Sequence, residues 1–248
     1  MALHSDFLRL PLAHRGLHSR GIPENSLTSF RAAIEAGYGI ELDIQPAADC
    51  TPMVFHDYDL ARMCGDESYI TDMDLDDIAQ LRLLGTDEAI PTLAETLREV
   101  AGRVPLLIEI KDQDGRLGTN IGGVHERVAA ALAAYEGPVA VMSFNPNTVE
   151  AFGELTPEIA RGLTSCAFDK EEWPMLDAES RASLSALEHF DQTGAQFVSH
   201  DWRDLDREPL ISLQSRGVPV LCWTVRSGEE EAEARRIAGG ITFENYHP

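Results

Sequence analysis

The sequence predicts an α/β fold, a single (β/α)8 barrel, on three observations. Short apolar segments recur along the chain, and segments with helical periodicity lie between most of them. The apolar segments have few polar positions, which indicates strands buried on both faces, as in a parallel sheet covered by helices. A length of 248 residues fits a barrel, and no Gly-x-Gly-x-x-Gly follows the first strand. We therefore expect one barrel domain over residues 1–248.

The predicted strands are the apolar segments, most of which end in a polar residue. They are residues 10–14, 38–44, 52–56, 105–110, 139–144, 160–165, 196–200, 219–225 and 240–244. This is one strand more than an eight-stranded barrel contains. The connection between the second and the third, residues 45–51, is too short for a helix.

The predicted helices have apolar residues at helical spacing and recognisable ends. Residues 25–37 begin with polar side chains and stop at a glycine, and residues 92–103 open with Thr92 and Glu95, the pattern of a capping box. Three further segments are predicted to be helical: 124–137, 208–217 and the acidic run 229–236.

The segment 57–91 departs from this alternation. It is acidic, irregular and long for a connection within a barrel. We expect it to form a small insertion between the third and fourth strands, and it is a candidate lid beside the site.

The chain is strongly acidic, with 42 Asp and Glu against 20 Lys and Arg and a formal net charge of −22. This charge argues against nucleic-acid partners and against stable membrane anchoring, and a site for a phosphate must supply its own positive charge. The four cysteines are scattered, which predicts free thiols in a reducing compartment. With no leader-like N-terminus and no run of about 20 apolar residues, a cytoplasmic location is predicted.

Polar side chains end the first four predicted strands. Barrel active sites lie at the carboxyl ends of strands, so these side chains are expected to converge on one cleft. They are His14, Arg15, Glu41, Asp43, His56, Asp57, Glu109 and Lys111.

Three of these side chains are carboxylates aimed at one volume. Glu41 and Asp43 are two residues apart on a strand and so share a face. With Glu109 they form an all-oxygen ligand set, which favours Mg²⁺ or Ca²⁺ over zinc. The alternative is a buried ion network in which the carboxylates pair with Arg15 and Lys111.

His14 and His56 are suited to proton transfer near neutral pH. One is expected to take a proton from the attacking oxygen, and the other to donate one to the leaving oxygen. Structural roles for both histidines are the alternative. His200, Ser143 and Phe144 also end predicted strands, and Ser143 and Phe144 are expected to line the pocket.

The order and spacing of these motifs resemble the glycerophosphodiester phosphodiesterase family. No single motif is specific, but the combination spans most of the chain. The motifs are AHRG (13–16), PENS (23–26), ELD (41–43), VFHD (54–57), IPTLAE (90–95), IEIK (108–111), SFNP (143–146) and WTV (223–225).

The resemblance implies a TIM barrel that uses a divalent metal, Mg²⁺ or Ca²⁺, to hydrolyse glycerophosphodiesters to sn-glycerol 3-phosphate and an alcohol. It also implies that the glycerol 2-hydroxyl attacks phosphorus and that water then opens a cyclic phosphate. The acid–base pair would be His14 and His56. The predicted metal ligands are Glu41, Asp43 and Glu109, and the predicted substrate-binding residues are Arg15, Lys111, Ser143 and Trp223.

Two segments depart from the family's pattern. Ala47-Ala48-Asp49-Cys50 replaces the usual Thr-x-Asp-Gly, and the chain ends in ITFENYHP in place of Thr-Asp-x-Pro. Asn25 in PENS is expected to cap the helix that follows and to brace the loop after His14.

Other functions remain open at this point. One is phospholipase D-like hydrolysis of lysophospholipids, which needs an apolar groove for an acyl chain. The others are a non-catalytic phosphodiester-binding barrel and a metal-dependent barrel hydrolase or lyase of another substrate class.

Overall fold

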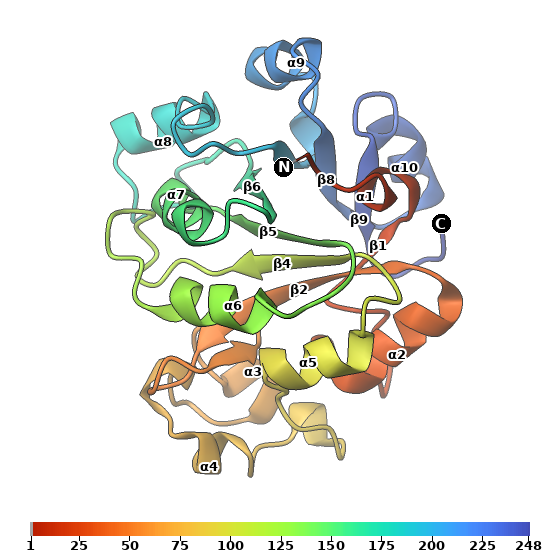
Figure 1. Cartoon of the computed structure of the whole chain (residues 1–248), viewed down its shortest axis with the longest axis vertical. Coiled ribbons are helices and arrows are strands. Elements are labelled where there is room, and N and C mark those ends of the chain that lie inside the picture. Colours follow the sequence, from red (N-terminus) through yellow and green to blue (C-terminus); the bar gives the residue numbers. More distant parts are fainter. Residues whose placement is uncertain (1) are drawn as a thin grey trace.

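The computed structural model describes residues 2–248, and its centre is a closed barrel of parallel strands (Figure 1). Eight of its nine strands form the barrel, which closes because β1 pairs with both β2 and β9. The predicted TIM barrel is therefore confirmed. The barrel strands are β1 (Leu12–His14), β2 (Gly39–Pro46), β4 (Leu106–Ile110), β5 (Val139–Ser143), β6 (Ala160–Ser165), β7 (Phe197–Asp201), β8 (Val220–Val225) and β9 (Gly240–Phe243).

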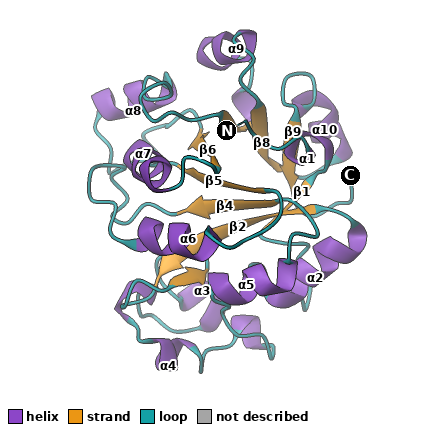
Figure 2. Cartoon of the chain, in the orientation of Figure 1, coloured by secondary structure: helices purple, strands orange, loops and turns teal. Residues whose placement is uncertain are grey.

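Helices follow the barrel strands and surround the sheet, as Figure 2 shows. They are α2 (Leu27–Ala36), α5 (Leu93–Val100), α6 (Val124–Leu132), α7 (Pro146–Leu155), α8 (Ala178–Ser185), α9 (Glu208–Ser215) and α10 (Gly228–Ala234). The short 3-10 helix η3 (Trp202–Asp204) follows β7, and α1 (Asp6–Arg9) precedes β1. Leu3 and Phe7 of this N-terminal segment pack with apolar residues of the barrel interior. The segment therefore closes the end of the barrel opposite the polar strand ends.

The predicted strand 52–56 is the one that does not belong to the barrel. Its ordered part is β3 (Pro52–Val54), which pairs antiparallel with the end of β2, Ile44 opposite Val54. A short loop can join antiparallel strands, whereas parallel neighbours need a long crossover. The brief connection, residues 47–51 in the structure, therefore closes a hairpin.

The predicted insertion follows β3 and lies to one side of the barrel, at the bottom of Figure 1. Its short elements are α3 (Ala61–Cys64), η1 (Ile70–Asp72), α4 (Leu75–Ile78) and η2 (Leu83–Gly85). They enclose an apolar cluster separate from the main core, made of Ala47, Met53, Phe55, Leu60, Met63, Ile70, Ile78, Leu83 and Ile90. The insertion thus has its own packing and supports the hairpin that carries His56.

The ends of two helices test the predicted caps. Thr92 and Glu95 form the predicted capping box at the start of α5, with the Glu95 amide donating to Thr92 and the Thr92 amide donating to Glu95. The expected cap on α2 is wrong by one residue. Ser26 caps this helix, since its hydroxyl accepts from the Ser29 amide at 3.1 Å, and Asn25 is directed elsewhere.

Replacing Thr92 by alanine is expected to lower the free energy of unfolding by about 1 kcal/mol, because the Glu95 amide at the start of α5 loses its acceptor. Urea unfolding of both proteins measures this difference. Thr119→Ala is the control, because Thr119 lies exposed in a loop. An equal loss in both variants would contradict a capping role.

No helix within residues 2–248 is long and apolar enough to cross a membrane.

Candidate active site

The polar residues at the ends of β1, β2 and β4 meet inside the barrel. His14 lies beside Glu41 in the sheet register, and Asp43 lies beside Glu109. Because alternate residues of a strand share a face, these side chains point into the barrel together. The structure therefore brings the four residues together at the carboxyl end of the barrel, as the sequence predicted.

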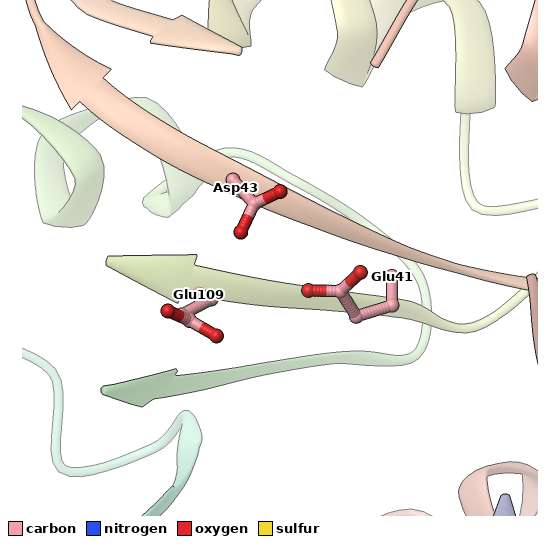
Figure 3. Close-up of side chains that lie close together, drawn as sticks. All are labelled: Glu41, Asp43 and Glu109. Atoms are coloured by element: carbon pink, nitrogen blue, oxygen red, sulfur yellow. The ribbon is translucent and has the colours of Figure 1, made fainter. Parts of the chain in front are cut away.

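Glu41, Asp43 and Glu109 form a compact cluster of carboxylates, and Figure 3 shows their side chains directed toward a common space. One oxygen of each lies within 4.8 Å of the others, and all three residues are buried. The Lys111 ammonium group lies 2.6 Å from a Glu109 oxygen and 3.3 Å from an Asp43 oxygen. Glu41 accepts a hydrogen bond from the backbone amide of Arg15 at 3.1 Å.

The local cations do not neutralise this cluster. Lys111 and Arg15 are the cations that contact it, and the Arg15 guanidinium also binds Glu24 at 2.7 Å. Burial, together with the neighbouring Asp43 and Glu109, raises the pKa of Glu41 well above its ordinary value. Burial also opposes the charge on Asp43, but Lys111 and the other cations outweigh it and lower the pKa of that carboxyl. One carboxylate is thus left in excess, and an all-oxygen donor set of this kind fits a hard divalent cation.

Each histidine of the site is hydrogen-bonded to a carboxylate through Nδ1. His14 Nδ1 lies 2.7 Å from a Glu244 oxygen, and His56 Nδ1 lies 2.7 Å from an Asp57 oxygen. An ionised carboxylate only accepts hydrogen bonds, so each Nδ1 carries a proton and Nε2 of each ring is the atom left to exchange a proton with a ligand. Arg62 bonds to Asp57 at 2.7 Å and so holds that carboxylate in place.

The electrostatics of the two carboxylates and of His14 are consistent with this pairing. The hydrogen bond from His14 and the nearby His18 ring, whose Nε2 lies 3.8 Å from a Glu244 oxygen, hold the pKa of Glu244 far below its ordinary value. The pKa of Asp57 is also lowered, because its bonds to His56 and Arg62 outweigh burial. Burial lowers the pKa of His14, and the bond to Glu244 offsets only part of that effect. The lowered pKa favours the neutral form of the His14 ring at pH 7.

The backbone after His14 shows why the HRG motif has this composition. Arg15 and Gly16 both have positive φ, 56° and 79°, and a Cβ on Gly16 would lie 2.3 Å from the Ser29 hydroxyl. This turn points the Arg15 amide at Glu41. Asn25 braces it, donating its backbone amide to the Arg15 carbonyl at 2.8 Å and its side chain to Asp43 at 3.0 Å.

Two cavities that share lining residues open beside these side chains. The smaller, of about 180 Å³, is lined by His14, Arg15, Glu41 and Asp43 together with Arg226 and Thr242. The larger, of about 620 Å³, extends outward over Tyr58, Leu117 and Trp173. The residues that line both cavities are His56, Glu109, Lys111, Phe144 and Trp223. These shared residues therefore lie where a small polar cavity meets a larger aromatic one.

One predicted site residue does not reach either cavity. Met142 lies beside Glu109 in the register and faces the barrel interior, so the next residue, Ser143, faces outward. The Ser143 hydroxyl donates to the Ile110 carbonyl at 2.7 Å and accepts from the Asn145 amide. Ser143 is a structural residue of the strand end, whereas Phe144 lines the pocket as predicted.

Two residues near the C-terminus were not predicted for the site. Glu244, which bonds His14, follows β9, and Arg226, which lines the smaller cavity, bonds Glu244 at 2.6 Å. The one sequence feature that pointed to the C-terminal segment was its departure from the family's Thr-Asp-x-Pro ending. His200 is excluded, because within residues 2–248 its ring is bonded to Ser165 and Asp204 on the outer side of the sheet.

Comparison with known proteins agrees with this geometry. The model of the glycerophosphoryl diester phosphodiesterase family matches residues 14–241, a range that contains every predicted catalytic residue and metal ligand. The chain belongs to this family. A glycerophosphodiester phosphodiesterase of Caldanaerobacter subterraneus subsp. tengcongensis is 32% identical over 243 residues, covering 94% of this chain and 91% of the relative. The predicted enzyme class is thereby confirmed.

Solved structures of this family share the barrel. The structure of an Oleispira antarctica phosphodiesterase in complex with the product sn-glycerol-3-phosphate has a TM-score of 0.76 at 24% identity, and the match covers 96% of this chain and 94% of that protein. A glycerophosphodiester phosphodiesterase from Parabacteroides distasonis ATCC 8503 has a TM-score of 0.75 at 21% identity, covering 94% and 92%. At these identities the likeness supports the fold of the phosphodiesterase barrel.

Proposed function

We propose that this family member hydrolyses glycerophosphodiesters to sn-glycerol 3-phosphate and an alcohol, with a divalent metal and with His14 and His56 as the acid–base pair. The observation that carries the proposal is the carboxylate cluster beside two histidines, each oriented by a carboxylate, where the two cavities meet. The Oleispira antarctica relative, which holds sn-glycerol-3-phosphate as its product, supports the same product here.

Glu41, Asp43 and Glu109 would hold the metal, either Mg²⁺ or Ca²⁺, since both prefer oxygen ligands. When bound, such an ion supplies Lewis-acid stabilisation of the charge that develops on phosphoryl oxygens. Arg15 and Lys111 line the smaller cavity and supply positive charge for the phosphate within an otherwise acidic protein. Trp223 forms an apolar wall at the junction of the two cavities.

The cavities divide the substrate into two halves. Glycerol 3-phosphate is the small, polar and constant half, so we place it in the cavity of about 180 Å³ beside the carboxylates. The alcohol then lies in the larger cavity. A long acyl chain on the glycerol would find little room in the smaller cavity, which disfavours the lysophospholipid alternative.

This placement assigns the two proton transfers. His14 lines the smaller cavity and not the larger one, so its Nε2 takes the proton from the glycerol 2-hydroxyl as that oxygen attacks phosphorus. His56 lines both cavities, so it donates a proton to the alcohol oxygen as the bond from phosphorus to that oxygen breaks. Water then opens the cyclic phosphate with the two histidines in reversed roles. Two positioned histidines also argue against a non-catalytic barrel.

The proposal is tested by measuring glycerol 3-phosphate released from a panel of glycerophosphodiesters, with and without EDTA. Release is expected from several diesters and is expected to stop with EDTA and return when Mg²⁺ or Ca²⁺ is added. A diester of 1,3-propanediol phosphate, which lacks the 2-hydroxyl, is expected to remain intact. Hydrolysis confined to lysophospholipids would instead support the phospholipase alternative, and hydrolysis of the propanediol diester would contradict attack by the glycerol 2-hydroxyl.

Glu244→Gln tests the role of the carboxylate that orients His14. We expect kcat/KM to fall by about 100-fold, because the imidazolium formed at His14 loses its counter-charge. The bond to Glu244 raises the pKa of His14, so its weakening lowers that pKa further. A base must be deprotonated to act, so the acidic limb of the pH–rate profile is expected to move to lower pH. The exposed Glu229→Gln is the control, and an unmoved limb in Glu244→Gln would contradict the assignment.

We also propose that residues 1–248 act as one domain in the cytoplasm. The four cysteines, Cys50, Cys64, Cys166 and Cys222, are all free thiols, and a reducing compartment preserves that state.

A further inference from the structure

The larger cavity has aromatic walls. Phe144, Trp173 and Trp223 line it on one side, with the Phe144 ring 5.1 Å from that of Trp173 and 5.6 Å from that of Trp223. Phe168 supports this group from behind, its ring 5.1 Å from that of Trp173. Tyr58, at the start of the insertion, completes the lining. The rings come from the ends of β5 and β8, from the loop after β6 and from the insertion, so the barrel and its insertion form the cavity together.

The same cavity is lined by carboxylates and lacks an available cation. Asp57, Asp59, Asp112 and Glu172 line it in addition to Glu109. Among the described residues of the lining, Lys111 is the one Lys or Arg, and its ammonium group is bound to Glu109 and Asp43. Glu172 is exposed at this cavity, and its side chain makes neither a hydrogen bond nor an ion pair within residues 2–248, so its charge is free to act on a ligand.

Aromatic faces and carboxylates together favour one class of alcohol. A cation over an aromatic face is attracted by the negative face of the ring, and a quaternary ammonium gains most because it sheds its weakly held water readily. Nearby carboxylates add to this attraction and repel alcohols that carry a negative charge. A neutral polyol such as glycerol gains little from either feature.

We infer that the larger cavity selects a cationic amino alcohol with a quaternary ammonium group of the choline type as the leaving alcohol. This inference rests on the proposed hydrolysis of glycerophosphodiesters and specifies its substrate. Trp173 and Glu172 are the specificity-determining residues, because both line this cavity and neither lines the one that holds the carboxylate cluster.

The test compares two esters of glycerol 3-phosphate that differ only in charge. One is the choline ester, and the other is the 3,3-dimethylbutyl ester, in which carbon replaces the quaternary nitrogen. We expect the wild type to prefer the choline ester by about tenfold in kcat/KM. Trp173→Leu is expected to reduce this preference at least threefold, and Trp173→Phe is expected to keep most of it. Glu172→Gln is expected to reduce the preference, whereas the adjacent exposed Glu171→Gln leaves it unchanged.

The outcomes separate this inference from the proposed function. Equal hydrolysis of the two esters by the wild type would overturn the inference and leave the proposed function intact. Preference for lysophosphatidylcholine over both esters would overturn it in favour of an acyl-binding cavity. If neither ester yields glycerol 3-phosphate, the proposed function fails. Quenching of tryptophan fluorescence by choline but not by 3,3-dimethylbutanol would then still support the cavity's ligand class, and equal quenching would overturn it.

Discussion

Replacing His56 by alanine is expected to slow hydrolysis of glycerophosphocholine by about 100- to 10,000-fold, the usual contribution of a general acid. The reason is geometric. His56 lines both cavities and is held through Nδ1 by Asp57, so its Nε2 proton is available where the alcohol oxygen leaves. Steady-state rates of glycerol 3-phosphate release measure the loss.

A second substrate identifies which proton transfer is lost. A p-nitrophenyl ester of glycerol 3-phosphate has a leaving group that needs no proton, so His56→Ala is expected to release p-nitrophenol in the first turnover at close to the wild-type rate. His14→Ala removes the base and is expected to be slow on both esters. The exposed His247→Ala is the matched control and is expected to behave as wild type. Equal losses on the two esters in His56→Ala would contradict its assignment as the acid.

Replacing Glu41 by glutamine is expected to abolish metal-dependent activity, with a loss of at least 100-fold. Glutamine keeps the shape of the side chain but removes one of three charges that favour a divalent ion. Without metal, the negative charge of Glu41 is unfavourable in the folded protein, because burial and two neighbouring carboxylates oppose its ionisation. The metal-free variant is therefore expected to be at least as stable as the metal-free wild type.

Thermal unfolding with EDTA, Mg²⁺ and Ca²⁺ measures both effects of Glu41→Gln. A metal at 100 times its Kd adds about 2.7 kcal/mol of stability, which corresponds to about 5–10 °C in Tm for a domain of this size. We expect this rise in the wild type and in the control Glu67→Gln, an exposed residue of the insertion, and not in Glu41→Gln. A full rise in Glu41→Gln would exclude Glu41 as a ligand and favour the ion network with Arg15 and Lys111.

Contacts between residues distant in the chain escaped prediction. Glu244 is 230 positions from the histidine it orients, and only closure of the barrel between β1 and β9 brings them together. Asn25 was expected to cap a helix, but Ser26 takes that role and leaves Asn25 free to bind Asp43. Both cases depend on which partner lies within reach after folding. Local propensity does not contain that information.

The sequence by itself determined the barrel, the carboxylate cluster and the pair of histidines. These follow from local rules, since apolar runs predict buried strands, two-residue spacing predicts a shared face, and barrel strands end at one site. Only the tertiary structure decided that residues 52–54 form a hairpin outside the barrel, that Ser143 faces outward, and that aromatic and acidic side chains enclose a second cavity. Strand register, barrel closure and the packing of the insertion set these features, and each depends on contacts between segments far apart in the chain.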